Sequence, residues 1–213
     1  MSAQSFQRCL SRQRPTTHRA MIAGIALLIA AALYRLLPVF LGVTTEQHGW
    51  LPGFSPIAAI FLCGAACLPR RAAIAVPFAA VLLTDVLLNI HYGYPAVSLG
   101  MVVNCVAFSA IAGLGWQLRR NASYKTLLPA ALGSGLFFYF VSNTFAWLTV
   151  PGYTLSPSGW AQALTTGLPG FAPTWTFLRN ELLSNALFTS LFLASIQRIR
   201  ASDPVATPEP VRW

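Results

Sequence analysis

Four charged side chains lie inside long apolar stretches of this sequence: Arg35, Asp85, Arg179 and Glu181. A charge within hydrocarbon costs at least about 2.5 kcal/mol on insertion scales, so each one needs an ionic partner, a wet cavity or the membrane interface. Two kinds of chemistry follow from this requirement. The four groups can form two ion pairs that fix helix packing, or they can line a site that recognises a polar solute.

Amide and aromatic side chains share helix faces with these charges, because residues four apart lie on one face of a helix. Asp85 and Asn89 have this spacing, Glu181 and Asn185 repeat it, and residues 139, 143 and 147 form a longer stripe. Arg179 and Glu181 are two apart and point about 200° from each other. The predicted substrate-binding residues are Arg35, Asp85, Asn89, Asn104, Tyr139, Asn143, Trp147, Arg179, Glu181 and Asn185.

Catalysis by the same carboxylates is an alternative. Asp85 or Glu181 could act as the general base of an intramembrane enzyme, which also needs a nucleophile, a metal or an acid at matching depth. The sequence contains no Ser/His or His-Glu-x-x-His signature and no Walker loop, so we expect no enzyme, no catalytic residue and no cofactor. Cys63 and Cys67 are four apart, a spacing more typical of close helix packing than of a metal pair, and we predict no metal site.

The composition indicates which elements position these groups. Of 213 residues, 55% are hydrophobic and 9% are charged, and the mean hydropathy is +0.60. Soluble domains carry about 25% charged residues, so the sequence predicts an all-α integral membrane protein. Six apolar stretches predict a bundle of six transmembrane helices, at 20–40, 53–68, 72–90, 96–118, 126–148 and 172–197.

The remaining basic residues predict an orientation. Twelve of the 14 Lys and Arg residues lie before the first stretch, between stretches two and three, between four and five, or after the sixth. The alternate connections, 41–52, 91–95 and 149–171, contain none. The positive-inside rule therefore places both termini in the cytoplasm of a multi-pass protein of the bacterial inner membrane. The net charge of +9 then indicates orientation and does not indicate nucleic-acid binding.

This topology divides the chain into three parts. Residues 1–19 form a basic cytoplasmic segment, residues 20–197 form the six-helix transmembrane domain, and residues 198–213 form a disordered cytoplasmic tail. Cleavage of the first apolar stretch as a secretory signal is a second interpretation of the N-terminus, because a basic segment precedes it and small residues follow.

The same topology places the intramembrane polar groups at similar depth, toward the extracytoplasmic side. The long outer connection 149–171 is rich in Gly, Pro and aromatic residues and is expected to contain a short helix that begins near Ser158. It can serve as a lid or as an interfacial aromatic belt. Polar groups confined to the outer side favour capture of an external solute over a continuous pore.

Several motifs carry a family resemblance: Arg35-Leu36-Leu37-Pro38, residues 54–59, Pro77 with Thr84-Asp85, Phe137-Phe138 with Asn143 and Trp147, and residues 167–180. Over residues 30–195 the chain resembles an uncharacterised bacterial family of six-helix membrane proteins. That family is similar to the substrate-binding S components of energy-coupling-factor vitamin transporters. Cobalamin-type members would carry a cysteine in an outer loop, and none stands there in this sequence.

The resemblance implies a pocket roofed by outer loops and a surface of small residues on the first helix. A transmembrane coupling protein with ATPase subunits would bind that surface, at Ala20, Gly24, Ala26 and Ala30. The sequence therefore predicts a membrane-embedded component that binds a vitamin-like small molecule for transport. An intramembrane enzyme and an assembly or scaffold protein are the alternatives.

Overall fold

The computed structural model describes residues 22, 25–26, 29–30, 33–36 and 53–202. All regular structure in these residues is helical, and helical positions occur at 22, 25–26, 29–30 and 33–35 before the first complete helix. Residues 1–19, the whole 41–52 connection, the end of the tail, Ala20 and Gly24 lie outside the described residues. The complete helices are α4 (Ile57–Cys67), α5 (Arg70–His91), α6 (Leu99–Leu118), α7 (Tyr124–Thr149), α8 (Pro157–Leu164) and α9 (Thr174–Ser202), with the 3-10 turn η2 (Arg119–Asn121) between α6 and α7.

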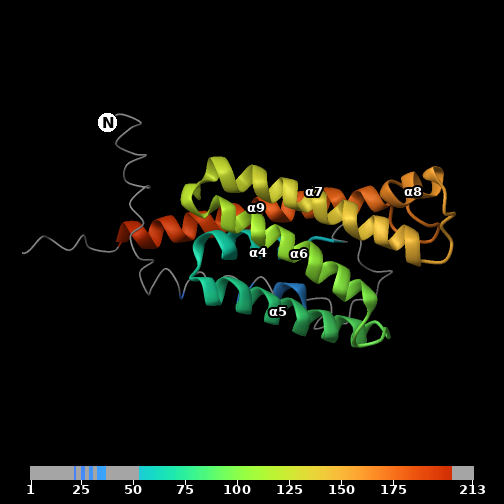
Figure 1. Cartoon of the computed structure of the whole chain (residues 1–213), viewed down its shortest axis with the longest axis horizontal. Coiled ribbons are helices and arrows are strands. Elements are labelled where there is room, and N and C mark those ends of the chain that lie inside the picture. Colours follow the sequence, from blue (N-terminus) through green and yellow to red (C-terminus); the bar gives the residue numbers. More distant parts are fainter. Residues whose placement is uncertain (1–21, 23–24, 27–28, 31–32, 37–52, 203–213) are drawn as a thin grey trace, which may run out of the picture.

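Three of the helical segments are long and apolar enough to cross a membrane: Ala73–His91, Leu99–Asn121 and Tyr124–Thr149. This confirms an all-helical protein with membrane-length helices. The predicted stretch at 53–68 contains a helix of only 11 residues, α4, and ten of these are buried. An apolar helix of this length is typical of a buried core helix. Accordingly, α4 contacts α5, α6, α7 and α9, which lie around it (Figure 1).

The middle of helix α9 has polar residues on its inner face and leucines on its outer face. Leu183, Leu187 and Leu191 are exposed at four-residue intervals, while Ser184 and Asn185 are completely buried. This arrangement is the reverse of a helix in a soluble protein, and hydrocarbon is the surrounding that it suits. Helix α9 also contains charged residues and is not among the three apolar spans.

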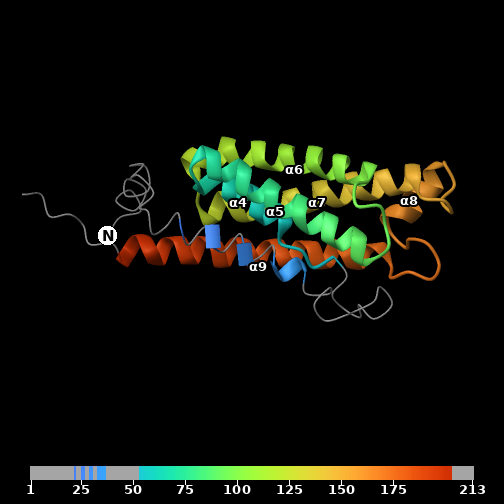
Figure 2. The same cartoon turned by 90° about the horizontal axis from the view of Figure 1, so that it is seen from below.

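The charged residues distinguish the two ends of the bundle. At one end lie the α4–α5 and α6–α7 junctions and the C-terminal end of α9 (Figures 1 and 2). These segments contain Arg71, Arg119, Arg120, Lys125 and Arg198, and we call this end the basic end. At the opposite end lie the α5–α6 loop, α8 and the connections of α8, and their residues 92–98 and 150–173 contain no charged side chain.

Stacked aromatic rings hold α4, α6 and α7 together. The rings of Phe61 and Phe108 lie 4.9 Å apart and nearly parallel, and Phe138 stacks on Phe108 at 4.8 Å. Nearer the basic end, a Cβ on Gly115 would lie 2.4 Å from the carbonyl oxygen of Leu62, so only glycine permits this approach of α6 to α4. The helices are therefore in close contact between the basic end and Phe138.

Candidate functional site

Beyond Phe138 the helices enclose a cavity of about 410 Å³ at the uncharged end. Small-molecule sites typically have volumes of about 300–1,000 Å³, so this one can hold a small organic ligand. The lining comes from α7, α9 and the connections around α8, together with Gly53 and Tyr94. Its residues are Gly53, Tyr94, Phe138, Tyr139, Ser142, Asn143, Ala146, Val150, Tyr153, Gly167, Leu168, Phe171, Ala172, Thr174, Phe177 and Glu181.

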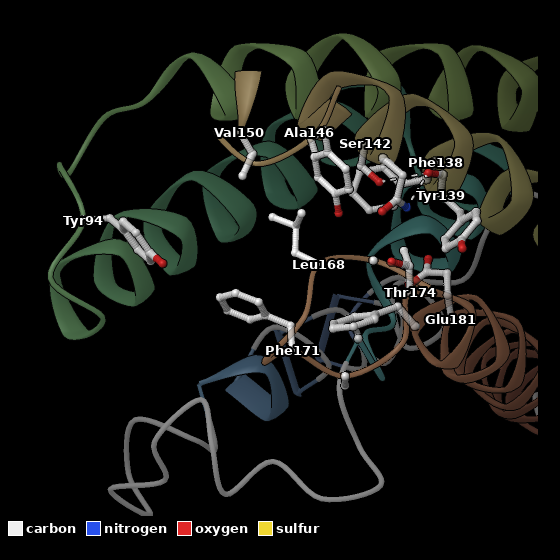
Figure 3. A pocket seen from close by; sticks show the side chains of 16 residues that line it. Tyr94, Phe138, Tyr139, Ser142, Ala146, Val150, Leu168, Phe171, Thr174 and Glu181 are labelled. Atoms are coloured by element: carbon white, nitrogen blue, oxygen red, sulfur yellow. Dashed lines mark hydrogen bonds between the residues drawn. The ribbon is translucent and has the colours of Figure 1, made fainter. Parts of the chain in front are cut away.

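The cavity has a buried end and an exposed end. Figure 3 shows Glu181 and Thr174 at one end and Tyr94 at the other, with Leu168 and Phe171 between them. Glu181 and Tyr139 are only 7% and 8% exposed, whereas Tyr94 and Phe171 are 65% and 74% exposed. The one acidic lining residue therefore lies deep, and aromatic rings surround the entrance.

Glu181 is held by its neighbour one turn along α9. Asn185 Nδ2 donates a 3.0 Å hydrogen bond to Glu181 Oε1, and Asn185 Oδ1 accepts a 3.0 Å bond from the backbone N–H of Ala59. Ala59 lies in the first turn of α4, where backbone N–H groups lack helical acceptors and where the N-cap residue Pro56 offers no side-chain bond. Asn185 therefore caps α4 from another helix and fixes the Glu181 carboxyl group at the cavity.

The other predicted intramembrane charges do not line the cavity. Arg35 and Asp85 form an ion pair, and Arg35 also donates a 2.9 Å hydrogen bond to Thr84 Oγ1. Asp85 is buried, and this pair joins the first helical segment to α5. Arg179 is exposed, lies 5.6 Å from the ring centre of Trp175, and donates a bond to Asn180 Oδ1 at 3.1 Å.

The stripe on α7 binds the segment that contains α8. Tyr139 donates to the carbonyl of Leu164 at 2.6 Å, and Trp147 Nε1 donates to the carbonyl of Thr154 at 2.9 Å. Trp160 of α8 donates to Thr144 Oγ1 at 3.1 Å. Asn143 is the middle member of the stripe and lines the cavity. Three aromatic side chains, two from α7 and one from α8, therefore fix this segment against α7.

The short helix in that connection begins slightly earlier than predicted. Its N-cap is Ser156 rather than Ser158, because Ser156 Oγ accepts the N–H of Gly159 at 3.2 Å. Pro157 follows at the first helical position, where its missing N–H costs nothing.

The remaining predicted residues have other surroundings. Asn89 Nδ2 lies 3.5 Å from both the Ala96 carbonyl and Met101 Sδ, so it joins α5 to α6. Asn104 is partly buried on α6, away from the cavity lining. Ala26 and Ala30, predicted as partner contacts, are both exposed. Of the ten predicted binding residues, Tyr139, Asn143 and Glu181 line the cavity.

Sequence reasoning missed most of the aromatic lining, including Tyr94, Tyr153, Phe171 and Phe177. Tyr94, Tyr153 and Phe171 had a signal, because they cluster with Gly and Pro in connections between the apolar stretches, a pattern that an interfacial belt produces equally well. Phe177 lies within α9 and had no such signal. Only the tertiary structure brings Tyr94 from the α5–α6 loop toward the segment after α8.

The donor chemistry of the site does not suit a metal. Throughout the described ranges, no three His, Cys, Asp or Glu side chains lie close enough together to hold a metal ion. A single carboxylate with hydroxyl, amide and aromatic groups is instead typical of a site for an organic molecule.

The fold and site define a class: an all-helical protein with membrane-length apolar helices and a cavity at the end opposite the basic end. Within that class, the chain belongs to a protein family of unknown function, DUF6580, whose model matches residues 15–206. No curated protein and no solved structure matches the chain.

Proposed function

We propose that this protein captures a small organic solute from the extracytoplasmic side of a bacterial inner membrane, as the binding component of a transporter. The observation that carries the proposal is the cavity of about 410 Å³ with Glu181 at its buried end and aromatic residues at its entrance. The resemblance to S components of energy-coupling-factor transporters supports a vitamin-like ligand.

The distribution of charge supports the orientation. The segments at the cavity end contain no Lys or Arg, whereas the opposite junctions contain Arg71, Arg119, Arg120 and Lys125. By the positive-inside rule the basic end is cytoplasmic, and the cavity then opens outward. In this arrangement six helices lie in the membrane: the first apolar stretch, α4, α5, α6, α7 and α9, with α4 enclosed by the others and both termini in the cytoplasm.

Transport also requires a partner that changes the accessibility of the cavity. Ala26 and Ala30 are exposed and four residues apart, so they lie on one face of the first helical segment. Small residues at this spacing allow a second transmembrane helix to approach closely. A coupling protein with ATPase subunits is the proposed partner at this face.

The cavity offers less support for an intramembrane enzyme. Glu181 is the one acidic lining residue, and none of the lining residues is His, Cys, Lys or Arg. A general base would therefore act without a His, Cys or cationic partner from the lining, and tyrosine, Ser142 and Thr174 hydroxyls are the remaining groups that could exchange a proton.

Ligand retention tests the proposal. The chain is purified gently from its native membrane, and small molecules that remain bound are identified by mass spectrometry. The Ala146→Trp variant fills the cavity from α7, whereas Leu148→Trp makes the same change at an exposed position outside the lining. We expect a molecule that is enriched with the parent protein and Leu148→Trp and is lost from Ala146→Trp. Equal small-molecule content in all three proteins would overturn the proposal.

A further inference from the structure

Some hydrogen-bonding groups of the cavity already bond to the protein, whereas others have no partner in the described chain and can bond to a ligand. Ser142 Oγ and Asn143 Nδ2 both donate to the Tyr139 carbonyl, at 3.2 and 2.8 Å, and Tyr139 itself donates to Leu164. These three lining residues therefore direct donors at carbonyl groups of the protein. The hydroxyls of Tyr94, Tyr153 and Thr174 remain, together with the second N–H and the Oδ1 of Asn143, and a hydroxyl can donate or accept.

The carboxyl group of Glu181 is only half used. Asn185 donates to Oε1, and no group in the described chain donates to Oε2. Oε2 is also not enclosed by protein. In the described chain, the side-chain oxygens that are both buried and without a partner are those of Ser55 and Ser134, and Oε2 is not among them. Since Glu181 lines the cavity, this oxygen is available to a ligand.

No cation from the lining competes for that oxygen. Arg35 acts electrostatically on Glu181 from outside the lining, and Arg35 already pairs with Asp85. Arg179, two residues away on α9, is exposed and lies over Trp175. Arg35 reduces the attraction of a cation for Glu181 only in part, because Asp85 offsets its charge.

The aromatic lining adds a preference for cations and for flat ligands. Phe138, Tyr139, Tyr153, Phe171, Phe177 and Tyr94 contribute rings to the same cavity. The faces of such rings attract cations and stack on flat ligands. A carboxylate that accepts hydrogen bonds, combined with several aromatic rings, is complementary to a positively charged nitrogen on a planar molecule.

We propose that the ligand of this cavity is a planar organic monocation whose charged nitrogen donates a hydrogen bond to Glu181 at the buried end. This inference rests on the proposed function, because it names the class of solute that the same cavity accepts. The ring system then lies toward Leu168, Phe171 and Tyr94, where the cavity opens (Figure 3).

Three indole compounds of similar shape test the charge preference. Tryptamine is a cation at pH 7, tryptophol is its neutral alcohol analogue, and indole-3-acetate is an anion. Binding of each to the full-length protein in nanodiscs of zwitterionic lipid is measured by calorimetry, with empty nanodiscs as the reference. We expect tryptamine to bind about tenfold more tightly than tryptophol or better, as a charged hydrogen bond implies, and indole-3-acetate to bind most weakly.

The Glu181→Gln variant connects the preference to one side chain. Glutamine preserves the shape and removes the charge, so the affinities for tryptamine and tryptophol should become equal. Tryptophol binding at the parental affinity reports an intact cavity in that variant. Glu181→Asp retains the charge and should retain part of the preference for tryptamine.

The outcomes separate the two proposals. Equal binding of tryptamine and tryptophol to the parent protein, or tightest binding of indole-3-acetate, overturns the cationic ligand and leaves a small-molecule site intact. A preference for tryptamine that persists in Glu181→Gln overturns the role of Glu181. Failure of all three compounds to bind, while mass spectrometry finds a retained neutral or anionic molecule, overturns this inference alone. No retained molecule and no binding together overturn the proposed function as well.

Discussion

Helix α7 passes through two different environments. In its N-terminal half, Leu127 and Ala131 are completely buried against α4 and α6, and Gly135 lets Asn185 of α9 approach. In its C-terminal half, Tyr139 and Trp147 form hydrogen bonds to the α8 segment, and Asn143 faces the cavity. The same helix therefore contributes to an apolar packed region and to a hollow region held by hydrogen bonds.

The difference shows how a membrane bundle can be closed at one end and open at the other. Stacked aromatic rings and the contact at Gly115 hold α4 and α6 close together toward the basic end. At the cavity end, hydrogen bonds from Tyr139, Trp147 and Trp160 hold the α8 segment against α7 beside the cavity. We therefore expect changes in the packed region to alter stability alone, and changes in the hollow region to alter ligand binding as well.

The largest effect is expected at the ion pair in the cavity half. Asp85→Asn leaves the partly buried Arg35 without its counterion in the described chain, so the free energy of unfolding should fall by about 3–5 kcal/mol. Thermal unfolding in detergent measures this change. The double variant Arg35→Gln/Asp85→Asn should recover much of the loss and keep tryptamine binding. A folded double variant that has lost tryptamine binding would make the pair part of the binding site.

A smaller loss is expected at the bond between α9 and α4. Asn185→Leu leaves the Ala59 N–H unpaired in a buried position, which should cost about 2–3 kcal/mol. Hydrogen exchange should increase at the first turn of α4, and tryptamine binding should weaken because Glu181 loses its fixed partner. Asn104→Leu removes a partly buried amide of α6 and is the control. Equal exchange at α4 in the two variants would contradict the capping role of Asn185.

The packed region is tested by two glycines of α6. Gly115→Ala places a Cβ against the Leu62 carbonyl and should cost about 1–3 kcal/mol through forced displacement of α4. Gly113 has open space around its missing side chain, so Gly113→Ala should leave stability unchanged or raise it slightly. Folded Gly115→Ala should bind tryptamine like the parent. A loss of binding at constant stability would show that the two halves are coupled.

The smallest effects compare two tyrosines of α7 directly. Tyr139 donates to Leu164 near the cavity, and Tyr124 donates to Ser190 near the basic end at 2.8 Å. Substitution of either by Phe should cost about 1 kcal/mol. Only Tyr139→Phe should increase hydrogen exchange across residues 154–165 and weaken ligand retention. The comparison between the two halves would be wrong if both variants changed exchange in that segment equally.

Much of the helical architecture was predictable from the lengths of the apolar stretches, because the thickness of a bilayer or of a protein core sets the length of a buried helix. The stretches at 72–90, 96–118 and 126–148 agree closely with α5, α6 and α7. The stretch at 53–68 illustrates the limit. Its composition is apolar on every side, which is equally typical of a membrane span and of the short buried helix that α4 forms.

Pairing of the intramembrane charges was only partly predictable. Four charges allowed two ion pairs, and the structure contains one of these, between Arg35 and Asp85. Glu181 bonds to Asn185 and Arg179 lies over Trp175, both within α9. The angle between residues 179 and 181 correctly indicated that they face different surroundings. Their partners depend on how each helix is rotated in the bundle, and periodicity within one helix leaves that rotation undetermined.

The sequence by itself determined a helical, membrane-embedded class, the gathering of basic residues in alternate connections, and the few polar side chains that an apolar surrounding must accommodate. These properties follow from composition and spacing along the chain, because the transfer of side chains from water to hydrocarbon is a local quantity. Only the tertiary structure decided that Glu181 meets a cavity while Asp85 meets Arg35, and that loop aromatics form the cavity entrance. Such contacts join residues distant in sequence, and they depend on the relative rotation and depth of whole helices.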